Sequence, residues 1–446
     1  MRLKLRKLMD RALTACGYLA VGVMALFLLW VLVPVFTKGV GAYVFRGTME
    51  HRRMMLGEFG RGNPDRLRAE AADVWRAREP IYKAFAAFEQ ELDAMPASRR
   101  RELRPAFRDV REDVAVLLGS EPGAQLPALT RRMYGQTRWQ EARKKANAVL
   151  FEETWEYNDA GSRRVLVPRA TQFEGTALAP VFTSIERDLE AMMRPRLTVY
   201  PRFLTDHSID AHFFGGIGPE VVGTLYLSLG AMLVAVPLGI VAAIYFQEYA
   251  KEGPVIAFLR SCVNTLAGVP SVVFGLFGLA FFINTLRVSP GKSVLAGALT
   301  LALLVLPTVI RASEEAIAAV PRAYKEGAMA LGAGRFRTVA TVILPAALPG
   351  ILTGIVISMG RAAGETAPII FTAAVSVGQL VKPSEVLTQP TPALSWNLYN
   401  LCTEHEAVEE LRHVQFGMAA TLVLIVLALN LAAILLRARV ARQLKG

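Results

Sequence analysis

The sequence predicts an all-α polytopic membrane protein of six transmembrane helices, with a large, mainly helical insertion after the first helix. Six apolar runs are each long enough to cross the bilayer core, which takes about 20 helical residues. A long polar segment separates the first run from the other five, and basic residues lie outside the first and last runs. The runs cover residues 12–36, 219–247, 255–286, 293–311, 345–375 and 415–437.

The net charge of +12 is better explained by topology than by a nucleic acid partner. Arg and Lys residues gather before the first run and after the last, and such clusters mark the cytoplasmic side of a membrane protein. An even number of spans agrees with two cytoplasmic termini. We therefore expect a multi-pass protein of the bacterial inner membrane that contacts lipid and binds no nucleic acid.

These assignments divide the chain into three parts. Residues 1–36 form the cytoplasmic N-terminus and the first span, and residues 37–215 form a periplasmic insertion. Residues 216–446 form a core of five helices, interrupted by a cytoplasmic loop at 312–344. Long outer segments translocate largely regardless of their charge, so the Arg-rich insertion does not contradict this orientation.

The insertion reads mainly as helices. Apolar residues recur at helical spacing from Leu67 to Leu92 and again from Leu103 to Leu117. We expect a third helix over Trp139–Trp155, and a loop or short strand over 161–176. The segment contains no catalytic constellation. Two interpretations remain open: a helical packing domain, or a docking surface for an external partner.

The loop 312–344 is too polar to span the membrane. Its pattern predicts a short helix from Ser313 through Ala319 and a second helix from Ala323 to Leu331. Gly332 follows the second helix and supplies the left-handed conformation that often ends one. The loop therefore reads as a compact structure on the cytoplasmic side.

We identify Arg361 and Glu365, in the fifth run, as the only ionisable residues deep inside any of the six apolar runs. An Arg at the bilayer centre costs at least about 2.5–3.5 kcal/mol, so such residues usually face a bundle interior or a cavity. Their i, i+4 spacing places them on one helix face, where they can neutralise each other. A guanidinium also matches the oxygens of an oxyanion. The pair is therefore either a structural ion pair or part of an anion site.

The loop resembles the EAA signature of ABC importer permeases, in which this segment docks on the ATPase subunit. Gly327 stands where that family usually has Ala, and Val342 where it has Ile, but the spacing is intact. The resemblance implies coupling to a separate ATPase dimer, which would hold ATP and Mg. The coupling residues that it implies are Glu326, Gly327, Ala328, Gly332, Leu344 and Pro345.

The segments Arg361–Ala373 and Gly215–Thr224 resemble PstA-type phosphate permeases. This resemblance extends over residues 203–446, whereas 37–202 exceeds the short outer loop of that family. It implies phosphate import, with Arg361 and Glu365 on the substrate path. A second charged station would be formed by Arg311 and Glu314. The implied partners are a second, PstC-like permease and a periplasmic phosphate-binding protein.

Alternative functions follow from the same patterns. The docking loop would equally serve a permease for molybdate, sulfate or phosphonate, and an outer helical domain would also suit a membrane-anchored sensor. Gly291-Lys-Ser293 lacks the first glycine of a phosphate-binding loop, so we expect no ATP site, no cofactor and no enzymatic activity in this chain. Glu404, His405, Glu406 and His413 lack paired ligand spacing, so we expect no metal.

Overall fold

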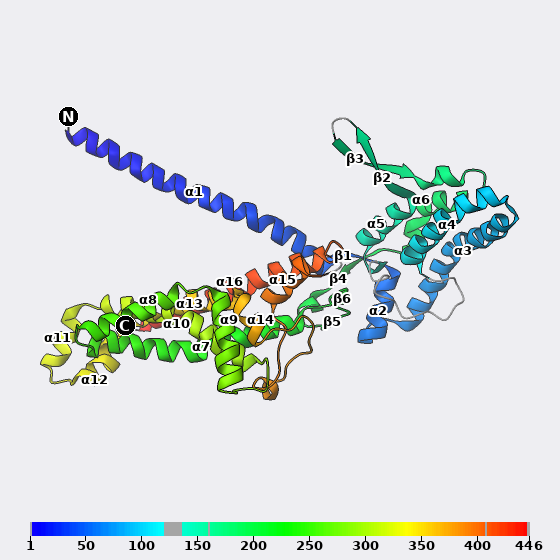
Figure 1. The fold of residues 1–446 in the computed structure, drawn as a ribbon. Coiled ribbons are helices and arrows are strands. Elements are labelled where there is room, and N and C mark those ends of the chain that lie inside the picture. Colours follow the sequence, from blue (N-terminus) through cyan, green and yellow to red (C-terminus); the bar gives the residue numbers. More distant parts are fainter. Residues whose placement is uncertain (1, 120–135, 159–160, 406–407, 444–446) are drawn as a thin grey trace. The chain divides into compact units, whose positions relative to one another are not determined.

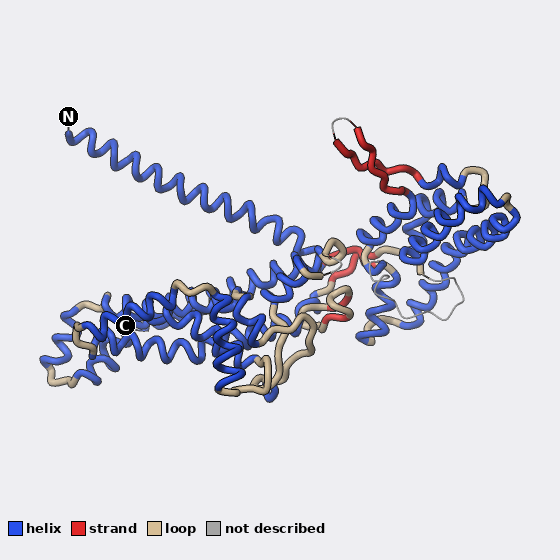
Figure 2. The backbone as a smooth tube through the Cα atoms, viewed as in Figure 1, coloured by secondary structure: helices blue, strands red, loops and turns tan. Residues whose placement is uncertain are grey.

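The computed structural model describes residues 2–119, 136–158, 161–405 and 408–443. Two compact units divide the chain: residues 1–40 together with 202–446, and residues 41–201. Helices predominate in both (Figure 2).

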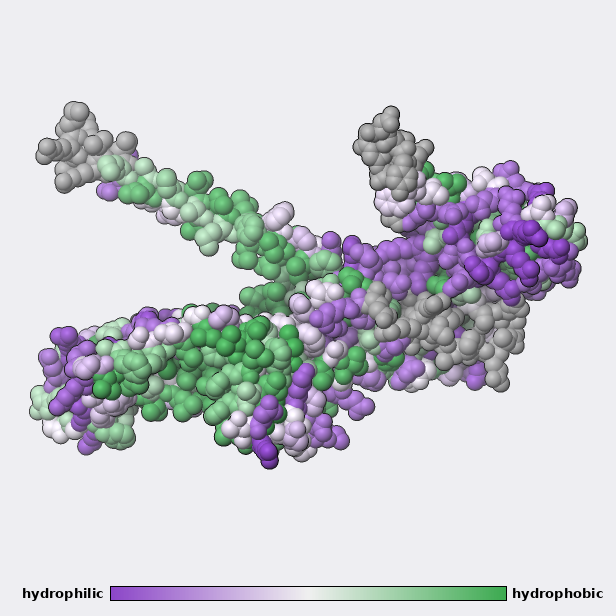
Figure 3. Space-filling view, viewed as in Figure 1, coloured by the Kyte–Doolittle hydropathy of each residue, from purple (hydrophilic) through white to green (hydrophobic). Residues whose placement is uncertain are grey.

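The first unit contains the helices that are long and apolar enough to cross a membrane. Within the described residues there are five, plus one bent pair that would make a sixth span. This agrees with the predicted all-α polytopic class. Their apolar side chains form a hydrophobic surface (Figure 3). The five are α1 (Arg2–Tyr43), α7 (Gly218–Ile244) with its π-helical end η4 (Tyr245–Tyr249), α10 (Val294–Ala318), α12, η6 and α13 (Arg335–Thr338, Val339–Ile343 and Leu344–Gly364), and α16 (Arg412–Gln443).

The predicted run 255–286 is not one straight helix. It consists of α8 (Pro254–Ala267) and α9 (Ser271–Gly278), and α9 continues as η5 (Leu279–Thr285). The two halves are bent by 102°. Pro270 lies at the break, where a proline cannot donate the helical hydrogen bond and disfavours helix in the residue before it.

The fifth run is also broken. Helix α13 ends at Gly364, and a short helix, α14 (Ala367–Thr372), follows after two residues. Pro368 lies in the first turn of α14, which is a favourable position for proline. The apolar run 345–375 is therefore not one continuous helix, and the charged pair lies at the end of α13.

The loop 312–344 differs from expectation at its start. Helix α10 continues through Ala318, so no separate helix begins at Ser313. The second helix of the loop is present as α11 (Arg322–Ala330), and Gly332 has the predicted left-handed conformation with φ of 84°.

Close helix packing forms the core of the first unit. Figure 1 shows α7, α10 and α13 running alongside one another. A side chain at Gly354 of α13 would overlap the Cβ atom of Ala312 on α10, and Gly350 approaches Ala316 in the same way. Small residues thus allow α10 and α13 to pack closely, as in other membrane helix pairs. Shorter elements complete this unit: β5 (Ser208–Ile209), β6 (Phe214–Gly215), η7 (Pro383–Glu385) and α15 (Leu394–Thr403).

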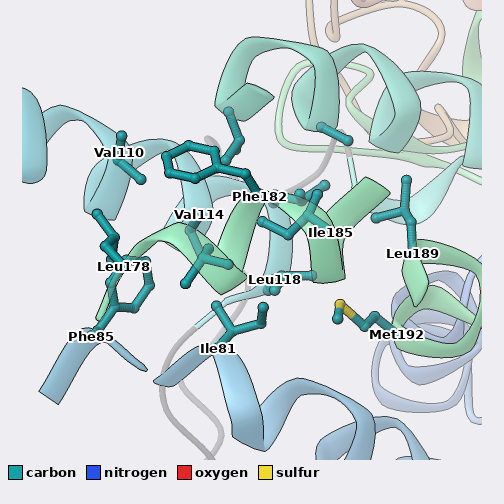
Figure 4. Packing of buried hydrophobic residues seen from close by; sticks show 14 of the residues in the cluster. Ile81, Phe85, Val110, Val114, Leu118, Leu178, Phe182, Ile185, Leu189 and Met192 are labelled. Carbon is teal, nitrogen blue, oxygen red and sulfur yellow. The ribbon is translucent and has the colours of Figure 1, made fainter. Parts of the chain in front are cut away.

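In the described residues of the second unit, four helices, α3 to α6, pack around an apolar core, and α2 lies beside them in sequence. Figure 4 shows Phe85, Val114 and Ile185 meeting from α3, α4 and α6. Strands β1 (Val44–Gly47) and β4 (Arg196–Val199) pair antiparallel. The helices are α2 (Met49–Phe59), α3 (Pro64–Ala94), α4 (Ala97–Leu118), α5 (Trp139–Leu150) and α6 (Ala179–Met193).

The predicted helices over 67–92 and 103–117 lie within α3 and α4. The prediction of a helix over Trp139–Trp155 was wrong beyond Leu150, because β2 (Phe151–Asn158) begins there and pairs with β3 (Gly161–Pro168). A 3-10 turn, η2 (Arg169–Phe173), follows the hairpin.

Candidate functional site

Arg361 and Glu365 form the ion pair that their spacing predicted. Arg361 lies in the last turn of α13, and Glu365 is the residue that caps this helix. The Arg361 Nε atom donates a hydrogen bond of 3.1 Å to Oε1 of Glu365. The Arg361 side chain is 41% exposed and that of Glu365 is 18% exposed. The guanidinium can therefore meet a ligand without first leaving a buried pocket.

The surroundings of this pair differ on its two sides. Gly360 faces α16, where a Cβ would lie 3.5 Å from Val426, whereas Gly364 has no atom within 4 Å of its would-be Cβ. Ser395 of α15 donates a hydrogen bond of 3.0 Å to the backbone carbonyl of Glu365. The break between α13 and α14 is thus held by α15, with open space beside Gly364.

A second group of charged residues lies at the far end of α10. Arg311 and Glu314 line a cavity of about 220 Å³ together with Arg260 of α8. Nε of Arg260 is 3.7 Å from Oε1 of Glu314, an ion pair too long for a hydrogen bond. Both atoms are buried, and neither has a hydrogen-bond partner among the residues that the structure describes. The cavity thus holds a buried cationic donor with unused capacity.

Arg260 was missed by the sequence analysis. Its Nη2 atom donates a hydrogen bond of 3.2 Å to the carbonyl of Phe246, which fixes the guanidinium at the cavity wall. The sequence did contain a signal, because Arg260 is an ionisable residue within the apolar run 255–286. Arg361 and Glu365 do not line this cavity, so the structure keeps the two charged stations separate.

The predicted coupling residues lie around α11. Glu326, Gly327 and Ala328 are on this helix, which has no buried residues, and Leu344 and Pro345 begin α13. Exposed apolar side chains lie beside them: Leu331 is 91% exposed and Phe336 is 79% exposed. Exposed apolar groups at the end of a polar loop are typical of a protein interface.

A second cavity adjoins this helix. It measures about 460 Å³ and is lined by Glu326, Lys325 and Met329 of α11 together with Glu248 of η4. Lys325 pairs with Glu248, so the loop is tied to the end of α7. The cavity is therefore lined by both α11 and η4, the two elements that this ion pair connects.

The described residues contain no group of three His, Cys, Asp or Glu side chains that could hold a metal ion. Of the residues considered for a metal, Glu406 lies outside the described part of the chain. Glu404 accepts a hydrogen bond of 3.1 Å from Asn400.

The candidate membrane spans define a polytopic membrane protein. The family model described as "Binding-protein-dependent transport system inner membrane component" matches residues 235–446. A probable ABC transporter permease of Bacillus subtilis, YqgI, is 34% identical over 242 residues, which cover 52% of this chain and 81% of the relative. The chain belongs to this family of binding-protein-dependent inner membrane components.

Two further relatives carry more particular names. The phosphate transport system permease protein PstA 1 of Mycobacterium tuberculosis is 37% identical over 225 residues, covering 50% of this chain and 71% of the relative. A probable PstA of Methanocaldococcus jannaschii is 35% identical over 263 residues, covering 57% and 85%. The predicted resemblance to PstA-type permeases is confirmed.

Proposed function

We propose that this chain is the permease subunit of an ATP-driven importer that carries inorganic phosphate across the bacterial inner membrane. The PstA relatives support the substrate. The observation that carries the proposal is the accessible guanidinium of Arg361 at the broken end of α13. A planar fork of N–H donors binds the oxygens of a phosphate ion in pairs and remains charged at all relevant pH values.

Glu365 gives this station a way to release its ligand. The carboxylate is within hydrogen-bond distance of Arg361 and competes with phosphate for the same donors. The Glu365 carboxylate would repel phosphate bound at Arg361. The guanidinium could therefore exchange between Glu365 and phosphate, and it would hold neither partner irreversibly. Transport would then be a population shift between outward-facing and inward-facing states. No covalent bond is made or broken in this subunit.

Arg311 and Glu314 would form the inner station of the path, now joined by Arg260. The cavity holds two guanidinium groups, of Arg260 and Arg311, and two carboxylates, of Glu314 and Glu315. The guanidinium groups could bind an anion, and the carboxylates would oppose permanent binding. Glu314 belongs to the segment 312–344, so this station would lie on the cytoplasmic side under the orientation that we propose.

ATP would be hydrolysed on a partner ATPase dimer, where ATP and Mg would bind. The dimer would dock on α11 and the exposed Leu331 and Phe336. A second, PstC-like permease would complete the path, and a periplasmic phosphate-binding protein would deliver the substrate. Both termini would be cytoplasmic, and residues 41–201 would lie outside.

The decisive experiment is uptake of labelled phosphate into vesicles that contain this chain with its partner permease, ATPase and binding protein. We expect ATP-dependent uptake that excess sulfate, molybdate or phosphonate does not displace. Displacement by one of these anions would assign the permease to that oxyanion, since a guanidinium fork alone accepts any of them. Uptake that does not depend on ATP would contradict the importer.

A further inference from the structure

The second unit contains a charged groove that phosphate transport does not explain. The groove lies between α3 and α4 and has a volume of about 630 Å³. Four of its lining residues are arginines of α4, and two acids face them from α3. Figure 3 shows hydrophilic residues over the region of these helices. The lining residues are Glu89, Leu92, Asp93, Arg101, Arg104, Pro105, Phe107, Arg108 and Arg111.

The four arginines form a single row. Positions 101, 104, 108 and 111 follow an i, i+3, i+7, i+10 pattern, which places them within roughly a quarter turn of the helix and over about 15 Å of its length. The core face of α4 is made by other residues, including Leu103 and Val110. Like charges at this spacing destabilise a helix, so the row is not explained by folding.

The row is only partly neutralised. Arg111 pairs with Glu89, and Arg108 lies 3.5 Å from Asp109, but all four side chains are close to half exposed or more, so these pairs are weak. Arg101 and Arg104 have no carboxylate within ion-pair distance in the described residues. Two cations thus remain available at one end of the groove.

The groove is preformed. Phe88 of α3 and Phe107 of α4 stack edge to face, with ring centroids 4.9 Å apart, and Leu92 is buried between the helices. Because these contacts belong to the core of the unit, the two walls keep their spacing. A partner would therefore meet an ordered row of guanidinium groups, and less ordering entropy would be lost on binding.

We propose that this groove docks an acidic helix of the extracytoplasmic substrate-binding protein. The inference rests on the proposed function for the side of the membrane on which residues 41–201 lie. The charge pattern favours a protein helix over a free polyanion, because Glu89 and Asp93 on the facing wall would repel phosphate groups. A helix can instead present carboxylates to the arginine row and a basic residue to the acidic wall.

The test is binding of the phosphate-binding protein to the assembled transporter in nanodiscs, measured at several salt concentrations. The test variant is Arg101→Glu with Arg104→Glu. Its control is Arg66→Glu with Arg99→Glu, which makes the same charge change at exposed arginines of α3 and α4 outside the groove. We expect the test variant to weaken binding on the order of tenfold or more and to reduce its salt dependence, whereas the control changes binding little.

An equal loss of affinity for the binding protein in the test and control variants would overturn the proposal, because the effect would then follow net charge alone. An unchanged affinity in the test variant, or no binding to the unaltered transporter, would also overturn it. Direct binding of inorganic polyphosphate that the test variant abolishes, together with unchanged affinity for the binding protein, would assign the groove to a free polyanion instead. Phosphate uptake is a separate readout, so its failure would contradict the proposed function and leave this result standing.

Discussion

Lys325 of α11 forms an ion pair with Glu248 in η4, the π-helical turn that ends α7. Glu248 is only 9% exposed and Lys325 is 33% exposed. Because α11 buries none of its own side chains, this pair is a direct connection between the loop and a candidate span. A force applied to α11 by an ATPase would reach α7 through it.

Reversing one charge of this connection should uncouple transport. We expect Lys325→Glu to lower phosphate uptake at least several-fold while ATP hydrolysis continues, because two carboxylates would then repel each other at the end of α7. The measurement is the ratio of phosphate imported to ATP hydrolysed. Lys325→Glu combined with Glu248→Lys should recover much of that ratio, and a double variant no better than the single one would rule out the pair as the link.

A substitution at Glu326 would test docking of the ATPase separately from the Lys325–Glu248 ion pair. Glu326 lies on α11 beside Lys325 and lines the same cavity. Glu326→Lys should weaken or abolish association with the ATPase, since it reverses a charge on the face that we propose as the interface. Copurification and ATPase stimulation measure this. Normal values of both would exclude Glu326 from the interface, whereas the Lys325 variant should remain assembled.

Phosphate transport should depend on the shape of the Arg361 side chain as well as on its charge. We expect Arg361→Gln to abolish uptake, and Arg361→Lys to retain only a small part of it, because an ammonium cannot bind two phosphate oxygens in one plane. Uptake kinetics of assembled complexes would measure this. Arg412→Gln, which removes an exposed Arg that pairs with Glu409, is the control and should transport normally. Full uptake by Arg361→Gln would remove the residue from the path.

Sequence periodicity located the charged pair correctly but not its setting. The i, i+4 spacing of Arg361 and Glu365 predicted their contact, since this relation depends only on local geometry. Hydropathy could not predict that α13 ends at Gly364, because an apolar run stays apolar across a broken helix. The bend at Pro270 was missed for the same reason.

Arg260 was missed for a different reason. Its role depends on the approach of α8 to the end of α10, which lies about 50 residues later in the chain and is a tertiary contact. Hydrophobic periodicity predicted the helices α3 and α4. It did not predict the end of α5, because β2 follows α5 directly, without the Gly or Pro that usually marks a helix end.

Arg260 should prove as important to transport as the predicted Arg311. Removal of its charge leaves one guanidinium in the cavity, and a hydrogen bond to a charged group contributes about 1.5–3 kcal/mol. We therefore expect Arg260→Gln to reduce uptake on the order of tenfold or more. Arg412→Gln, at an exposed arginine outside both the cavity and the proposed ATPase surface, is the control. Unchanged uptake and phosphate affinity in Arg260→Gln would show that the buried donor does not meet the substrate.

His51 should make the stability of the second unit depend on pH. Burial, and then the positive charges of Arg138 and Arg52, lower the pKa of His51 from 6.5 to about 3. The unfolded chain therefore binds a proton below pH 6.5 that the folded unit does not bind. Stability should be fully present above pH 6.5 and should fall by about 1.4 kcal/mol per pH unit between pH 6.5 and 3 from this group.

Denaturant unfolding followed by tryptophan fluorescence would measure this effect, because Trp75 and Trp139 both lie in the second unit. His51→Gln removes the titrating group, so its unfolding free energy should fall less steeply with acidification than that of the unaltered protein. The comparison uses the slopes, and a constant loss of stability from the substitution would therefore not affect it. Equal slopes in the two proteins would mean that His51 takes up its proton in the folded unit as readily as in the unfolded chain.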